Sequence, residues 1–230
     1  WSGIPKYMTD IEGVRYIISS NGASVVELDT GKAVYTNGIP WERALEIFDI
    51  LEEYDTFYDA YALGNGWCEG RFFDNLEKYK IEPLIEQLVR KSRTRVEDLR
   101  EWLREHQAPV EKINMFFSDV EKRQRAYEEL SLIPDIAVTC SLVNNLEINH
   151  GTCNKGDALF NLGKLLHIPM EQIMACGDGN NDLEMIRRAG VGVAMENGEE
   201  IVKQAADFVT KTNDEEGVAF AIEKFCSLEI

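Results

Sequence analysis

The stretch GDGNNDLEM, residues 177–185, follows a short apolar run and leads into a helical pattern. This order is typical of the carboxyl end of a buried strand in an open α/β sheet, which is where such sheets place their ligands. Asp178 and Asp182 supply carboxylate oxygens, the hard ligands that Mg²⁺ prefers. Asn180 and Asn181 supply amides that can hydrogen-bond a phosphate or hold those carboxylates in place. The stretch therefore predicts a phosphate and metal site.

The same stretch resembles the last signature of the haloacid dehalogenase (HAD) superfamily, in the GDxxNDxxM form of its Cof-type phosphatases. A second similarity lies upstream, where LEINHGTCNKGDAL at residues 146–159 is similar to the strand, loop, Lys-Gly pair and helix of that family. The two motifs occur in the family order and are separated by a helix of suitable length. Together they are far more specific than either motif alone.

The resemblance implies a role for each matching residue. Lys155 would hold a phosphate oxygen and neutralise charge, which suits a compact ammonium group. Asp178 matches the family's Mg²⁺ ligand, and Asp182 would bind Mg²⁺ directly or through water. Asn181 matches the family's phosphate-contacting Asn, and Asn21 lies in a segment similar to the family's approach to the cap, where we expect it to bind substrate. Lys155 and Asp178 are therefore the predicted catalytic residues.

Structural roles are the alternative for the same residues. Lys155 is a solvated side chain at a helix start in that interpretation, although a cation there opposes the helix dipole. Asp178 is a turn former or helix cap, and Asp182 builds a capping arrangement with Glu184. A Ca²⁺ loop of the EF-hand type is excluded, because its sixth position would be Leu183 instead of Gly.

The first two signatures of the family are missing from this sequence. Family members open with an apolar strand that ends in DxDGT, whose first Asp is the nucleophile and whose second Asp is the acid and base. No DxD occurs in the 230 residues. Asp10 has no apolar strand before it and Asp29 lies in a predicted hairpin turn, so neither replaces the nucleophile. We therefore expect the chain alone to be inactive and the functional gene product to carry a further N-terminal segment.

The fold class follows from the order of the predicted elements. After residue 156 helices and strands alternate, which indicates a parallel, doubly wound sheet. The resemblance predicts an α/β fold with a HAD-like core, incomplete at its N-terminus, formed by residues 1–22 and 151–230. It also predicts an inserted α/β cap at residues 23–150 that selects the substrate. Without the first strands the sheet would need altered pairing or a second copy of the chain, which leaves a homo-oligomer open.

The hydrophobic periodicity predicts the individual elements. Predicted strands lie at residues 14–20, 24–28, 33–36, 57–63, 67–73, 112–117, 136–141, 146–149, 173–176, 191–195 and 207–210. Predicted helices lie at residues 41–54, 120–130, 157–166, 183–188, 199–205 and 217–225, and a further helix that ends near residue 106 starts at a capping box of Thr94 and Glu97.

Composition limits the classes of partner. The net charge of −17 opposes binding to nucleic acid phosphates and anionic lipids, so we expect neither as a partner. A small phosphorylated metabolite would have to be attracted locally, by Lys155 and bound Mg²⁺. The five cysteines are an odd number without a CxxC pair, which favours a reducing, cytoplasmic compartment.

Overall fold

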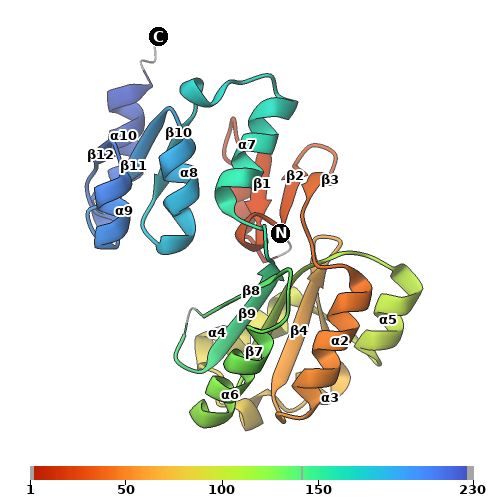
Figure 1. Cartoon of the computed structure of the whole chain (residues 1–230). Coiled ribbons are helices and arrows are strands. Elements are labelled where there is room, and N and C mark those ends of the chain that lie inside the picture. The colour runs from red at the N-terminus through yellow and green to blue at the C-terminus, as the bar shows by residue number, and fades with distance from the viewer. Residues whose placement is uncertain (1–2, 141, 227–230) are drawn as a thin grey trace. The chain divides into compact units, whose positions relative to one another are not determined.

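The structure, a computed structural model, describes residues 3–140 and 142–226 (Figure 1). The chain divides into two compact units, Trp1–Cys153 and Asn154–Ile230, which are described in turn. Trp1 and Ser2, at the start of the predicted core range 1–22, and Ser141, where a predicted strand ends, lie outside the described residues. The assignment of residues 1–22 to one core together with residues 151–230 stays a prediction.

The first unit opens with a short helix, α1 (Lys6–Thr9), and an antiparallel sheet in the order β1-β2-β3. The predicted hairpin is confirmed, because β2 (Ser24–Glu27) pairs with β3 (Lys32–Thr36) and Asp29 lies in the turn between them. The predicted strand at residues 14–20 is present in shorter form as β1 (Tyr16–Ser19), which pairs antiparallel with β2. The turn η1 (Ser20–Gly22) joins β1 to β2, with Asn21 and Gly22 at positive φ.

A six-stranded mixed sheet in the order β6-β5-β4-β7-β9-β8 forms the rest of the first unit. Its strands are β4 (Phe57–Ala62), β5 (Asn65–Glu69), β6 (Arg93–Val96), β7 (Val110–Phe116), β8 (Ile136–Thr139) and β9 (Asn145–His150). Its helices are α2 (Trp41–Glu52), α3 (Gly70–Phe73), α4 (Pro83–Ser92), α5 (Leu99–His106) and α6 (Val120–Leu130), with a 3₁₀ turn η2 (Leu76–Tyr79). These elements confirm the mixed α/β character predicted for this part of the chain.

The core of the first unit lies between the sheet and its helices. On α2, Ala44, Ile47, Phe48 and Leu51 are fully buried at helical spacing, so one face of that helix packs inward. The ring of Phe48 stacks on Tyr58 of β4 with 4.8 Å between ring centroids. Burial of such apolar side chains is the main stabilising term of this unit.

The structure corrects the predicted start of α5. Thr94 lies in β6, where it pairs with Trp67, and so caps no helix. The N-cap is Asp98, whose side chain accepts a hydrogen bond of 2.8 Å from the backbone N–H of Glu101. The predicted strand at residues 67–73 is also wrong beyond Glu69, because residues 70–73 form α3.

Replacement of Asp98 by alanine is expected to lower the free energy of unfolding by about 1 kcal/mol, since the cap hydrogen bond is lost. Thr94→Ala, the matched control, removes an exposed strand side chain and is expected to cost a few tenths of that value. Urea unfolding followed by circular dichroism measures both. A larger loss of stability for Thr94→Ala than for Asp98→Ala would show that Thr94 caps the helix, as the sequence predicts.

The second unit is built on a parallel sheet in the order β10-β11-β12, as predicted (Figure 1). Its strands are β10 (Met174–Gly177), β11 (Val191–Ala194) and β12 (Phe208–Val209). Its helices are α7 (Lys155–Leu165), α8 (Leu183–Arg188), α9 (Glu200–Ala205) and α10 (Gly217–Phe225), with 3₁₀ turns η3 (Met170–Gln172), η4 (Asn180–Asp182) and η5 (Asn213–Glu215). Ile186, Ala194 and Val202 form a small buried core between α8, β11 and α9.

Membrane-spanning helices are absent from the described part of the chain, since none of its helices has the length and hydropathy that crossing a bilayer requires.

Candidate active site

The acidic loop begins directly at the carboxyl end of β10, as the sequence predicts. Asp178 is the first residue after the strand, and η4 then leads into α8. Gly177 allows the loop to fold back tightly, because a Cβ atom at this position would lie 2.4 Å from Cβ of Asp182. The glycine therefore places the Asp182 carboxylate against the end of the strand.

Lys155 reaches the same loop from the first turn of α7. Asn154 caps this helix, since its side chain accepts a hydrogen bond of 2.7 Å from the backbone N–H of Asp157. The next residue, Gly156, lets α7 approach α8 closely, because a Cβ atom there would lie 2.7 Å from the backbone carbonyl carbon of Glu184. This contact brings the start of α7 beside the acidic loop.

The carboxylate of Asp182 joins the two motifs. Its Oδ1 accepts a hydrogen bond of 2.6 Å from Nζ of Lys155. Its Oδ2 accepts hydrogen bonds of 3.0 Å and 3.1 Å from the backbone N–H groups of Asp178 and Gly179. Asp182 is only 3% exposed, so these bonds form away from solvent. The predicted phosphate-binding Lys155 and the predicted metal ligand Asp178 are thus connected through one buried carboxylate.

Two opposing effects act on the pKa of Asp182. Burial alone would raise it, but the hydrogen bond from Lys155 and those from the backbone of Gly179 and Asp178 favour the ionised form. The net result is a pKa below the usual value for aspartate. Asp182 is therefore an anion at neutral pH, as a partner for an ammonium group must be.

The ionised form of Asp182 is expected to stabilise the protein in a pH-dependent way. Because folding lowers its pKa, the contribution is fully present above about pH 4, the pKa of an unfolded aspartate, and is lost as the pH falls through the folded-state value. We expect Asp182→Asn to lower the free energy of unfolding by about 2 kcal/mol at pH 7. That difference should shrink below about pH 4.

Urea unfolding of wild type and Asp182→Asn at about pH 7, 5, 4 and 3, a range that spans the titration of an aspartate, measures this effect. Glu184→Gln is the control, because this neighbouring carboxylate is exposed and forms a surface ion pair with Arg187. A constant difference between wild type and Asp182→Asn across the whole pH range would contradict the role given to the carboxylate.

The remaining predicted residues of the loop face solvent. Asp178, Asn180 and Asn181 are exposed. The carboxylate of Asp178 makes no hydrogen bond or ion pair within the described residues, whereas its backbone carbonyl accepts a hydrogen bond of 2.8 Å from the N–H of Glu199. An exposed, unpaired carboxylate at the end of a parallel strand is available to a cation.

Glu199 is a member of the site that the sequence does not reveal. Its Oε1 accepts a hydrogen bond of 3.3 Å from the backbone N–H of Asn180, and its own N–H bonds to the carbonyl of Asp178. It lies more than a dozen residues beyond the motif, after β11, and no local spacing marks it. Its place is set by the parallel pairing of β10 and β11.

The donor set of the site agrees with a magnesium ion that keeps most of its water. Over residues 3–140 and 142–226, no cluster of three or more His, Cys, Asp or Glu side chains suited to a metal is present. Mg²⁺ commonly uses one or two carboxylates and completes its shell with water and substrate phosphate. Asp178 fits a direct ligand, and Asp182, whose oxygens already accept three hydrogen bonds, fits a contact through water.

Asn21 belongs to the first unit. Its side-chain amide donates hydrogen bonds of 3.1 Å to Oδ1 of Asn149 and 3.4 Å to Oε2 of Glu147. These bonds hold the turn after β1 against the end of β9. The substrate-binding role expected for Asn21 stays a prediction.

Comparisons with known proteins agree on one family. The family described as haloacid dehalogenase-like hydrolase matches residues 1–222. The chain is 30% identical over 211 residues to the 5-amino-6-(5-phospho-D-ribitylamino)uracil phosphatase YcsE of Bacillus subtilis, covering 90% of this chain and 71% of the relative. It is 31% identical to the phosphatase YwpJ of the same organism, covering 89% of this chain and 77% of the relative.

A solved structure supports the fold. The haloacid dehalogenase-like hydrolase from Bacteroides thetaiotaomicron is similar with a TM-score of 0.75 and 29% sequence identity. The match covers 91% of this chain and 76% of that protein.

Proposed function

Because the chain belongs to the haloacid dehalogenase-like hydrolase family, whose α/β fold it shares, we propose that it provides the Mg²⁺ and phosphate site of a phosphatase for small phosphomonoesters. The predicted resemblance to this family and the predicted fold class are confirmed by the family match and the solved relatives. The enzyme class is that of the relatives, a phosphoric monoester hydrolase.

The hydrogen-bonded chain from Lys155 through Asp182 to the backbone of Asp178 carries this proposal. It places a positive ammonium group and the start of an acidic loop at one end of a parallel sheet. Phosphoryl transfer asks the protein mainly to position the phosphoryl group and to neutralise its charge. A fixed cation and an available carboxylate are the groups this task requires.

Each residue has one task in the proposed mechanism. The ammonium of Lys155 donates to a non-bridging oxygen of the phosphate while it keeps its bond to Asp182. Asp178 would hold Mg²⁺, Asp182 would contact the ion through water, and Asn181 would donate its amide to the phosphate. The bound ion supplies further neutralisation of the phosphate charge. By resemblance, the first Asp of a DxDGT segment would attack phosphorus to form an aspartyl phosphate as the bond from phosphorus to the leaving oxygen breaks. The second Asp would protonate that leaving oxygen and then activate the water that hydrolyses the aspartyl phosphate to free phosphate.

The substrate class follows from the relatives and from the charge of the chain. YcsE is named for a phosphorylated ribitylamino compound, and we extend to this chain the class of small phosphomonoesters that includes sugar phosphates. The net charge of −17 repels such anions at long range, so binding rests on Lys155 and Mg²⁺ close to the phosphate. A cytoplasmic location agrees with a metabolite of this kind.

A phosphate-binding module without turnover is the second candidate. It is favoured by one observation, the absence of DxD from the 230 residues. Cys176 in β10 offers no replacement nucleophile, because burial raises the pKa of its thiol and only the thiolate attacks. Residues 1–230 alone would then bind phosphate and Mg²⁺ but hydrolyse nothing.

Hydrolysis of p-nitrophenyl phosphate with and without Mg²⁺ tests the proposal. We expect turnover from a protein in which a DxDGT segment precedes Trp1, and none from residues 1–230 alone. Calorimetric titration of residues 1–230 with phosphate in the presence of Mg²⁺ should still show binding. Turnover that persists in EDTA would reject the dependence on Mg²⁺. An extended protein that binds phosphate without turnover would favour the binding module, and one that neither binds nor hydrolyses would reject both candidates.

A further inference from the structure

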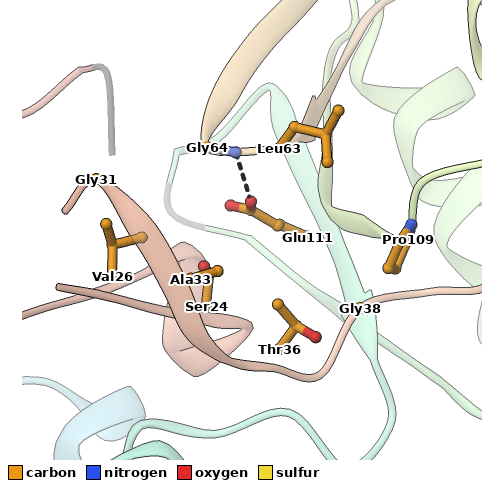
Figure 2. A pocket seen from close by; sticks show the side chains of 10 residues that line it. All are labelled: Ser24, Val26, Gly31, Ala33, Thr36, Gly38, Leu63, Gly64, Pro109 and Glu111. Atoms are coloured by element: carbon orange, nitrogen blue, oxygen red, sulfur yellow. Dashed lines mark hydrogen bonds between the residues drawn. The ribbon is translucent and has the colours of Figure 1, made fainter. Parts of the chain in front are cut away.

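A cavity of about 410 Å³ lies within the first unit, between the β2–β3 hairpin and the start of β7. Figure 2 shows its lining, with Ser24, Val26 and Ala33 on the hairpin and Leu63, Pro109 and Glu111 facing them. Ligand pockets in proteins have volumes of roughly 300–1,000 Å³ and walls that are mostly apolar with a few polar groups. The cavity has this character, since Val26, Leu63 and Pro109 are apolar and Glu111 is charged.

Glu111 brings a nearly buried carboxylate to this cavity. It is 5% exposed and accepts a hydrogen bond of 2.9 Å from the backbone N–H of Gly64 (Figure 2). It accepts a second hydrogen bond, of 3.2 Å, from the hydroxyl of Ser20. A carboxylate offers about four acceptor positions, so two are left. Within the described part of the chain no Lys, Arg or His forms an ion pair with Glu111, and none lines the cavity.

Ser24 adds a second polar group that lacks a partner. The residue is 1% exposed, and its Oγ is buried without a hydrogen bond to any described residue. A buried hydroxyl left in this state costs stability, because it has lost its hydrogen bonds with water. Ser24 lines the cavity, so a ligand there can restore the missing bond.

We propose that this cavity binds a small organic ammonium compound with an apolar body. The ammonium group donates hydrogen bonds to the carboxylate of Glu111 and to Oγ of Ser24, and the body packs against Val26, Leu63 and Pro109. An organic cation satisfies both polar groups at once and compensates the buried negative charge. The net charge of −17 attracts such a cation, whereas it repels an anionic ligand.

Calorimetric titration of the whole chain with 2-phenylethylammonium tests the proposal, and 2-phenylethanol serves as the neutral analogue of the same shape. We expect a dissociation constant on the order of 1 mM for the cation and binding at least about tenfold weaker for the alcohol. Glu111→Gln should weaken binding of the cation about tenfold or more, and Ser24→Ala about fivefold. Glu121→Gln, which removes an exposed carboxylate of α6, is the charge-matched control and should bind as wild type.

Ala33→Phe is a second variant that tests the proposal if Glu111→Gln loses hydrogen bonds and disturbs the fold. Ala33 is exposed at the edge of the cavity, so a phenylalanine fills the space without entering the core. We expect this variant to keep the circular dichroism spectrum and melting temperature of wild type and to lose binding. Equal binding of cation and alcohol, no binding of the cation by wild type, or unchanged binding in Ala33→Phe would each overturn the proposal.

Discussion

Asp178→Asn is expected to lower kcat/KM for p-nitrophenyl phosphate about 10³-fold in a protein that carries the DxDGT segment. The exposed carboxylate of Asp178 has no partner among the described residues, which leaves it available for the proposed role as a Mg²⁺ ligand. An amide keeps the shape of the side chain but loses the negative charge that retains the ion. Loss of one electrostatic contact of this kind typically costs a factor of 10² to 10³ or more, which is roughly 3–4 kcal/mol in the transition state.

Measurement of activity against Mg²⁺ concentration distinguishes this role from a structural one. If Asp178 is a metal ligand, Asp178→Asn should need a higher Mg²⁺ concentration for half-maximal activity, while its unfolding free energy stays within about 0.5 kcal/mol of wild type. Glu184→Gln is the control, because Glu184 is an exposed acid of the same motif. Full activity with an unchanged Mg²⁺ requirement in Asp178→Asn would remove the metal assignment.

Lys155→Met is expected to have an effect of similar size, a loss of about 10³-fold in kcat/KM. The ammonium group donates a hydrogen bond of 2.6 Å to Asp182 of the acidic loop. Methionine removes the positive charge and keeps much of the apolar stem of the side chain. The variant also leaves Asp182 as a buried anion without its ion-pair partner, so the protein should lose about 2–3 kcal/mol of unfolding free energy as well. Lys164→Met on the same helix is the matched control, because Lys164 is exposed and lies over Phe160.

A double-mutant cycle separates the two consequences of losing Lys155. If Asp182 acts by holding the ammonium group, Asp182→Asn should cost less activity than Lys155→Met and should add little in the double variant. Stability should behave in the same way, because the buried anion is absent from the double variant. Independent, additive losses would show that Asp182 works without Lys155.

Most of the predicted elements are present, and the main exceptions are α4 and the start of α5. Helix α6 has the predicted bounds, 120–130, because an N-cap at Asp119 precedes the pattern and turn residues follow it. Helix α4 was not predicted, although Pro83 stands in its first turn and Ile85, Leu88 and Val89 recur at helical spacing, so the signal for a helix is present in the sequence. The local sequence at Thr94 fits a helix cap, but in the folded protein Thr94 pairs with Trp67 in the sheet. The tertiary contact therefore overrides the local capping preference.

The sequence predicted that Lys155, Asp178 and Asp182 lie together, but not the contacts between them. Motif spacing placed Lys155 and Asp178, yet it gave no sign that Asp182 would use both carboxylate oxygens to connect them. That connection depends on how closely two helices and a strand approach, and Gly156 and Gly177 set those distances. Glu199 was missed for the same reason, because only the folded sheet brings it to the loop.

The bond between Lys155 and Asp182 has a consequence for the energetics of substrate capture. A free lysine side chain gives up as much as about 1.5–2 kcal/mol of rotational entropy when a ligand immobilises it. In the folded protein the hydrogen bond to Asp182 already restricts the side chain of Lys155, and the ammonium group keeps two further protons to donate. In the proposed mechanism the phosphate therefore meets a donor that has already lost much of its conformational freedom, and more of the attraction between them remains as affinity.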